Sequence, residues 1–178
     1  MIILGIDPGT AICGFGIIDY SEGNLKALNY GAITTSAKAR MQDRLEKIYD
    51  NLDSLIKEYK PEIMGIEKLF FGRNSTTAIP VGQARGIVLL AAVKNQVEII
   101  ERTPNEIKQS VTGYGGAAKE QVIYMVTKLL HLVEEPKPDD VADALAVAIC
   151  AAHTADTFTQ LDASPQLKLG DSNYHINR

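Results

Sequence analysis

Four acidic residues lie in or beside apolar segments, where burying a carboxylate is energetically unfavourable unless it has a partner. Asp7 ends the first apolar run of the chain, and Glu67 lies within a later apolar run. Asp140 and Asp143 come directly before residues 144–152, which are apolar almost throughout. A charge buried without a partner is unfavourable, whereas carboxylate oxygens are good ligands for hard divalent cations. The four positions therefore indicate a carboxylate cluster that binds metal ions.

The two acids in strand-like runs also have simpler explanations. Asp7 precedes Pro8 and Gly9, and an aspartate in that position can simply start an Asx turn. For Asp7, the turn and the metal site both stay open. Glu67 is followed by Lys68, so the strand could end there with its carboxylate in solvent. The apolar residues before Glu67 favour a buried strand and hence a functional role.

The two aspartates near residue 140 are three residues apart, which places both carboxylates on one face of a helix. Acids are common in a first helical turn, where they cap free N–H groups and complement the helix dipole. Such a role explains Asp139 or Asp140 well. Asp143 lies too far into the helix to cap it, and an apolar segment follows. We therefore expect Asp143 to bind a ligand.

Together, the acids supply oxygen ligands for a two-metal site. Two ions about 3.5 to 4 Å apart can clamp a phosphodiester and serve both the attacking water and the leaving oxygen. Oxygen ligands favour Mg²⁺, with Mn²⁺ as a substitute, and we expect two ions per site. The histidines His131, His153 and His175 lack metal-ligand spacing, and we expect them to be solvated at the surface.

Hydrophobic periodicity predicts the elements that position these acids. The first 34 residues contain three strand-like runs separated by turns, which indicates an antiparallel meander. Alternating helices and strands follow, and then three helices, so the fold class is α/β with a mixed central sheet. The expected strands are 2–6, 14–20, 25–34, 63–71 and 97–101, and the expected helices are 41–59, 77–95, 105–111, 120–132 and 139–153.

Composition bounds the class of protein. The chain has 178 residues, of which 46% are hydrophobic and 22% charged, as expected for one globular domain. It has no apolar run of the roughly 18 residues that a membrane helix needs and no signal-peptide pattern, so we expect a cytoplasmic protein. Cys13 and Cys150 are expected to be buried thiols. We expect a nuclease domain over 1–153 and a polar, disordered tail over 154–178.

The formal net charge of −4 argues mildly against a nucleic-acid partner, because affinity for DNA comes largely from Lys and Arg. That objection weakens if the acids gather around bound cations, since the metal then sets the local field. Global charge therefore does not decide the question.

Four sequence blocks, in order and spacing, resemble the RuvC family of Holliday junction resolvases. The DxGT run alone is weak, because sugar kinases and actin-like ATPases share it. Four ordered blocks across about residues 1–153 are much more specific. They are Ile-Leu-Gly-Ile-Asp-Pro-Gly-Thr at 3–10 with Gly-Phe-Gly at 14–16, Ile-Glu-Lys-Leu-Phe at 66–70, Gly-Gln-Ala-Arg-Gly at 82–86, and Asp-Val-Ala-Asp-Ala-Leu-Ala at 140–146.

The resemblance implies a ribonuclease H-like fold and a homodimer that acts in DNA recombination and repair. Such an enzyme makes paired nicks in opposed strands of a four-way junction and leaves 5′-phosphate and 3′-hydroxyl ends. On the matching positions, Asp7, Glu67, Asp140 and Asp143 would be the catalytic residues and hold the metal ions. A two-fold junction also suits a closed two-fold protein. Family members work with the RuvA and RuvB branch-migration complex, which is the expected partner.

The same resemblance implies the DNA contacts. Phe70 would stack on a base at the opened junction, and Lys108 and Lys119 would contact phosphate near the cut. Arg73 and Arg85 would either contact DNA or form ion pairs. The helix that carries Gly82 and Gly86 is the candidate dimer interface, because small residues permit close approach of another backbone.

Three other functions compete with this interpretation. An actin-like or sugar-kinase ATPase needs a second phosphate loop in a second domain, for which the chain has neither the length nor the sequence. A different ribonuclease H-like nuclease, acting on RNA or an RNA:DNA hybrid, is not excluded by the acids alone. A junction-binding protein without catalytic activity is disfavoured because all four acids are present.

Overall fold

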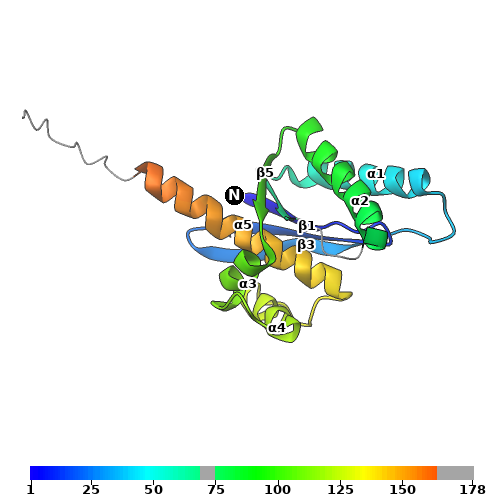
Figure 1. Cartoon of the computed structure of the whole chain (residues 1–178). Coiled ribbons are helices and arrows are strands. Elements are labelled where there is room, and N and C mark those ends of the chain that lie inside the picture. The colour runs from blue at the N-terminus through cyan, green and yellow to red at the C-terminus, as the bar shows by residue number, and fades with distance from the viewer. Residues whose placement is uncertain (69–74, 164–178) are drawn as a thin grey trace, which may run out of the picture.

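A five-stranded mixed sheet forms the centre of the computed structural model, which describes residues 1–68 and 75–163 (Figure 1). The strands lie in the order β3-β2-β1-β4-β5. Neighbours pair antiparallel from β1 to β3, whereas β1 with β4 and β4 with β5 pair parallel. The strands are β1 (Ile2–Asp7), β2 (Ile12–Ser21), β3 (Asn24–Thr34), β4 (Ile63–Glu67) and β5 (Glu98–Arg102).

The hairpin between β2 and β3 has the tight turn that its sequence predicts. Glu22 and Gly23 both adopt positive φ angles, of 51° and 80°. A two-residue turn with this backbone matches the twist of antiparallel strands. The predicted meander is confirmed, and the parallel strands follow it as expected. Because β1 and β4 are parallel, their carboxyl ends meet at the same edge of the sheet.

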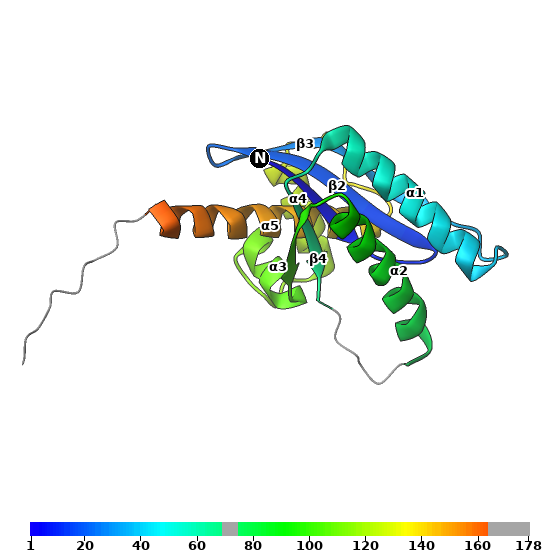
Figure 2. The same cartoon turned by 90° about the horizontal axis from the view of Figure 1, so that it is seen from above.

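Helices cover both faces of the sheet (Figures 1 and 2). On one face, α1 and α2 pack over a core that includes Leu4, Ile17 and Met64. On the other face, α3, α4 and α5 enclose a second core that includes Ile3 and Ile18. The alternation of strand side chains between the two faces requires two cores. The helices are α1 (Met41–Tyr59), α2 (Ser75–Lys94), α3 (Pro104–Thr112), α4 (Lys119–Leu129) and α5 (Asp139–Ala163).

Helix α5 lies close to the sheet because glycines leave room for it. A Cβ atom added at Gly14 would lie 2.1 Å from the backbone oxygen of Asp140, and one at Gly5 would lie 2.1 Å from that of Ala144. Real Cβ atoms do not approach backbone so closely, so larger residues there would push the helix away. The first turns of α5 are thereby held against β2 near the end of β1.

The largest differences from the expected element boundaries lie in α5 and β4. Helix α5 continues to Ala163, so residues 154–163 are helical although we expected them to belong to the tail. The side chains of Thr154 and Thr157 donate hydrogen bonds to the carbonyls four residues earlier, and adding residues to an existing helix is easier than starting one. Strand β4 ends at Glu67, and residues 69–71 of the expected strand lie outside the described residues.

The predictions for the cysteines were confirmed, whereas the prediction for one histidine was wrong. Cys13 and Cys150 are buried free thiols, as predicted. The prediction that His153 is solvated is wrong, because its Nδ1 lies 2.9 Å from the Ser110 hydroxyl and its ring packs edge-on against Tyr20. Across residues 1–68 and 75–163, we find no helix with the length and apolarity that crossing a membrane requires.

Candidate active site

Two of the predicted acids end neighbouring parallel strands. Asp7 is the last residue of β1, and Glu67 is the last residue of β4. The register pairs Ile6 with Ile66, so the two acids that follow lie at the same carboxyl edge of the sheet. Ligand sites of α/β sheets favour this edge. Both residues are half-buried, in contrast to the solvent-facing alternative for Glu67.

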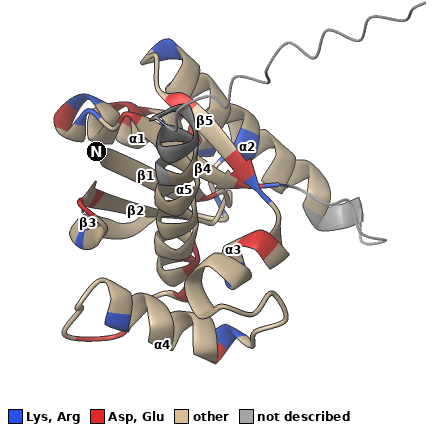
Figure 3. Ribbon diagram, turned by 90° about the vertical axis from the view of Figure 1, so that its left-hand side faces the viewer, with Lys and Arg blue, Asp and Glu red and all other residues tan. Residues whose placement is uncertain are grey.

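The other two acids come from the first turns of α5. Asp140 and Asp143 are half-buried, and the contact between Asp140 and Gly14 brings this end of the helix to the sheet edge. Gly14 is also the strand partner of Asp7. Figure 3 shows α5 uncharged through its middle with acidic residues at its start, and residues 144–152 of the helix carry no charged side chain. The first turns of the helix thus bring their acids to the place where the strand acids lie.

The four acids lie close enough for their charges to affect one another's pKa values. Burial, together with the nearby negative charges of Asp143, Asp140 and Glu67, raises the pKa of Asp7 to about 7. The pKa of Glu67 is raised by burial and then by Asp143. Like charges disfavour ionisation of their neighbours, so these carboxylates repel one another. A group of acids held together against this repulsion is typical of a functional site.

The acids have not already closed around a cation-sized space. Within residues 1–68 and 75–163, no three acidic, histidine or cysteine side chains are arranged as ready metal ligands. Instead, the Lys119 ammonium group occupies part of the site. Its Nζ lies 3.2 Å from one carboxylate oxygen of Asp143 and 3.2 Å from one of Asp139. A lysine here partly offsets the repulsion, since it lowers the pKa values of Asp7 and Asp143 against the effect of burial.

A cleft of about 160 Å³ opens beside the acids. Both lysines expected to contact phosphate line it, Lys108 from α3 and Lys119 from α4, and Lys108 lowers the pKa of Glu67 against the effect of burial. Helix α3 is fixed at its start by a capping box between Thr103 and Glu106. The cleft is lined by Glu67, Pro104, Ile107, Lys108, Lys119, Val122, Asp143 and Ala146.

Arg85 serves an ion pair, which is one of the two roles expected for it. Its guanidinium group lies 2.7 Å from the carboxylate of Glu101 on β5 and donates a hydrogen bond to the backbone oxygen of Glu67. Only 11% of the Arg85 side chain is exposed. A guanidinium group with two partners and so little exposure is poorly placed for DNA. Arg85 therefore fixes the end of β4, where Glu67 lies.

Phe70 and Arg73, the remaining predicted DNA contacts, lie outside the described residues. Their roles stay predictions from the family resemblance.

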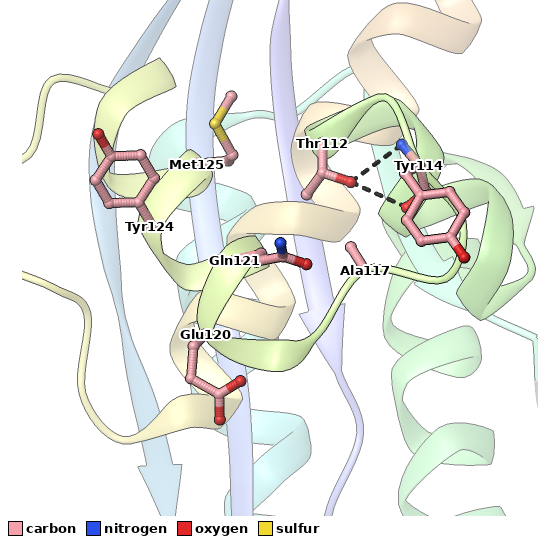
Figure 4. A pocket seen from close by; sticks show the side chains of 7 residues that line it. All are labelled: Thr112, Tyr114, Ala117, Glu120, Gln121, Tyr124 and Met125. Atoms are coloured by element: carbon pink, nitrogen blue, oxygen red, sulfur yellow. Dashed lines mark hydrogen bonds between the residues drawn. The ribbon is translucent and has the colours of Figure 1, made fainter.

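A second and larger hollow of about 430 Å³ lies on another side of α4 (Figure 4). Tyr114 borders it and is held by hydrogen bonds with the Thr112 hydroxyl. The lining includes one carboxylate, that of Glu120, and no basic side chain. It is made up of Thr112, Tyr114, Ala117, Glu120, Gln121, Tyr124 and Met125. This groove, unlike the cleft, brings together no charges of both signs.

Sequence reasoning missed three contributors to the site. Asp139 was explained as a helix-start residue, but it also holds Lys119. Gly5 and Gly14 set the distance between α5 and the sheet. A signal for the glycines was available, because small residues in buried strands face the alanine-rich helix that follows Asp143. The Lys119 contact had no local signal, since 20 residues separate it from Asp139.

Comparisons with known proteins agree with this geometry. The family model described as crossover junction endodeoxyribonuclease RuvC matches residues 3–151. The crossover junction endodeoxyribonuclease RuvC of Heliobacterium modesticaldum is 54% identical over 154 residues, covering 86% of this chain and 95% of that protein.

Solved structures give the same result for the fold. The structure of Thermus thermophilus RuvC is similar with a TM-score of 0.81 and 34% identity, over 89% of this chain and 98% of that one. The complex of T. thermophilus RuvC with a Holliday junction substrate matches with a TM-score of 0.81, 32% identity and the same coverage. The expected ribonuclease H-like fold is thereby confirmed.

Proposed function

Because the chain belongs to the RuvC family of crossover junction endodeoxyribonucleases, we propose that it resolves Holliday junctions with the four carboxylates at the sheet edge. The observation that carries this proposal is the convergence of Asp7, Glu67, Asp140 and Asp143 from three elements. The similar T. thermophilus protein has been solved with a Holliday junction substrate, which supports the choice of DNA. We also propose a cytoplasmic location, because the relatives act on DNA.

The donor set fits Mg²⁺, with Mn²⁺ as substitute, and two ions per site. All four predicted ligands offer oxygen atoms, which hard cations prefer. Their mutual repulsion would be relieved by a divalent cation, and the approach of Lys119 to Asp143 shows that positive charge is favourable there. When bound, such ions supply positive charge beside both the attacking and the leaving oxygen of a phosphodiester.

The protein's own residues position the substrate. Asp7 and Glu67 stand on strands, and Arg85 fixes the backbone of Glu67, so these carboxylates are held in place. Lys108 and Lys119 line the cleft and would bind the phosphates that flank the scissile bond. Preorganised charges of this kind stabilise developing negative charge without reorganisation. Phe70 would stack on a base and Arg73 would contact DNA by family resemblance.

A homodimer is supported by an apolar stripe on α2. Ile79, Leu90 and Val93 are exposed by 71%, 48% and 66%, respectively, although all three are large hydrophobic residues. Gly82 and Gly86 lie between them at helical spacing, and neither would meet another atom within 4 Å if it carried a Cβ. The stripe therefore offers a close-approach surface for the same stripe of a second copy. A two-fold dimer would present two sites to a two-fold junction.

The dimer can be tested by placing a charge in the stripe. Leu90→Glu should give monomers in analytical ultracentrifugation, and the wild-type protein should sediment as a dimer. Glu98→Gln, an exposed change outside the stripe, is the matched control. A variant that stays dimeric would contradict this interface. Partnership with the RuvA and RuvB branch-migration complex follows from the family and is part of the same proposal.

The function is tested by cleavage of defined substrates. A synthetic four-way junction should be nicked symmetrically in two opposed strands only when Mg²⁺ or Mn²⁺ is added. The products should carry 5′-phosphate and 3′-hydroxyl ends, shown by direct sealing with DNA ligase. Preferential cleavage of an RNA:DNA hybrid would contradict the proposal and favour the alternative ribonuclease H-like nuclease.

A further inference from the structure

One ammonium group joins the starts of two helices at the cleft. Lys119 is the first residue of α4, and Asp139 is the first residue of α5. The Lys119 Nζ lies 3.2 Å from a carboxylate oxygen of Asp139 and equally far from one of Asp143. A lysine is unfavourable at a helix N-terminus, because the helix dipole is positive there. The two aspartates, which suit the start of α5, therefore provide the attraction that holds Lys119 in place.

Asp139 differs from the four proposed metal ligands. Its side chain is 61% exposed, more than the 38% of Asp143, and it does not line the cleft. Both carboxylates contact the same ammonium group, but only that of Asp143 lines the cleft. Lys119 thus has one partner inside the site and one at its rim.

Binding of a divalent cation would affect the two ion-pair partners of Lys119, Asp143 and Asp139, in different ways. An ion held by Asp143 would repel the Lys119 ammonium group and compete for the same carboxylate. A lysine with no other partner would then be free to move into solvent, since its long side chain has many rotamers. Asp139 remains available to it, because its carboxylate lies outside the proposed ligand set.

We propose that Asp139 is a positioning residue that keeps the Lys119 ammonium group at the rim of the cleft when Asp143 takes a metal ion. Lys119 neutralises Asp143 before the ion binds and then stays, on Asp139, within reach of a DNA phosphate. This inference rests on the proposed function, because it assumes that Asp143 is a ligand and that Lys119 serves the substrate.

A double-mutant cycle separates this role from a direct effect of the Asp139 charge. Single-turnover cleavage of a four-way junction in Mg²⁺ is measured for wild type, Asp139→Asn, Lys119→Met and the double variant. Asp139→Asn alone should slow cleavage about tenfold, and in the Lys119→Met background it should change the rate by less than about twofold. Equal slowing in both backgrounds, or no slowing in the wild type, would overturn the proposal.

Two controls address the fold and the charge. Asp139→Glu, which keeps a carboxylate, should retain most of the wild-type rate. Glu120→Gln removes one negative charge from the residue next to Lys119 and should cleave like the wild type. If Glu120→Gln slows cleavage as much as Asp139→Asn, the effect is one of general charge and the proposal fails. Thermal unfolding should show that every variant still folds cooperatively, because the changed side chains are exposed.

Binding of Mn²⁺ without DNA gives a readout that does not depend on catalysis. In isothermal titration calorimetry, Lys119→Met should bind Mn²⁺ several-fold more tightly than the wild type, because the competing ammonium is gone. Unchanged affinity would overturn the competition step. A wild-type protein that neither binds Mn²⁺ nor cuts junctions would overturn the proposed function as well. Normal binding and cutting with no coupling in the cycle would overturn the role of Asp139 alone.

Discussion

Helix α4 separates two hollows that differ in how they are built. The cleft, of about 160 Å³, is lined by residues from β4, α3, α4 and α5 and collects Glu67, Asp143 and two lysines. The groove in Figure 4 is larger, about 430 Å³, but its whole lining comes from residues 112–125. The comparison shows that the volume of a hollow does not identify the functional site. The site is identified by charged groups that the fold brings together from distant parts of the chain against their mutual repulsion.

Removing one carboxylate from the cleft should have the largest effect. Glu67→Gln keeps the shape of the side chain but loses its charge, so we expect cleavage of a four-way junction to fall on the order of a hundred- to a thousand-fold. Binding of the junction in a gel-shift assay should survive, because we propose that lysines rather than acids contact phosphate. Loss of binding together with cleavage would show that Glu67 is structural and would break the contrast between the two hollows.

The cleft can also be disturbed without touching a charged side chain. Gly14→Ala would place a Cβ against the backbone oxygen of Asp140 and push the start of α5 from the sheet. We expect a loss of roughly 1 to 3 kcal/mol in the free energy of unfolding, measured with urea, and slower cleavage. Gly31→Ala, which would meet only the ring of Phe15, is the control and should cost less. Equal losses for both variants would contradict the positioning role of Gly14.

The pH dependence of stability should report the repulsion in the cleft. Because the pKa of Asp7 is raised to about 7, the folded metal-free protein holds a proton that the unfolded chain releases near pH 4. Stability should therefore fall as pH rises from about 4 to about 7, by up to about 4 kcal/mol. Asp7→Asn should remove most of this fall and be the more stable protein at pH 8 in EDTA.

The effect of Mg²⁺ on stability gives a second test of the repulsion around Asp7. Mg²⁺ should raise the melting temperature of the wild type at pH 8 more than that of Asp7→Asn, because a ligand that binds the folded state stabilises it. A wild-type protein whose stability does not depend on pH between 4 and 8 would show that Asp7 is not strained by its neighbours.

A change in the groove should have the smallest effect. Tyr124 is exposed by 54% and lines the groove without any charged partner from another element. Tyr124→Leu should therefore leave the cleavage rate within about twofold of the wild type, since exposed substitutions away from a site change little. A large loss of cleavage would show that the bigger hollow also serves the reaction.

The same contrast explains what could be predicted from the sequence. The four acids could be picked out from the sequence because a carboxylate in or beside an apolar run is unusual, and this can be seen from neighbouring residues alone. The strands and helices could be predicted from hydrophobic periodicity. The exception is the end of α5, where polar residues continue a helix that their composition does not predict. Both are properties of short segments.

Contacts between segments that are distant in the sequence could not be predicted from it. The role of Arg85 depends on Glu101 and on the end of β4, and neither partner is near it in the sequence. The contact between Lys119 and Asp139 likewise depends on how α4 packs beside α5. The family resemblance indicated that both basic residues matter, but only the fold distinguishes an arginine that fixes a strand from a lysine that faces the cleft.

The convergence of the acids into a cation site is tested most directly by crystallography with Mn²⁺. Crystals soaked in Mn²⁺ should show anomalous density between the strand acids, Asp7 and Glu67, and the helix acids, Asp140 and Asp143. The Lys119 ammonium should then have left Asp143. Mn²⁺ bound elsewhere, with Lys119 still on Asp143 and no density at the sheet edge, would contradict the account.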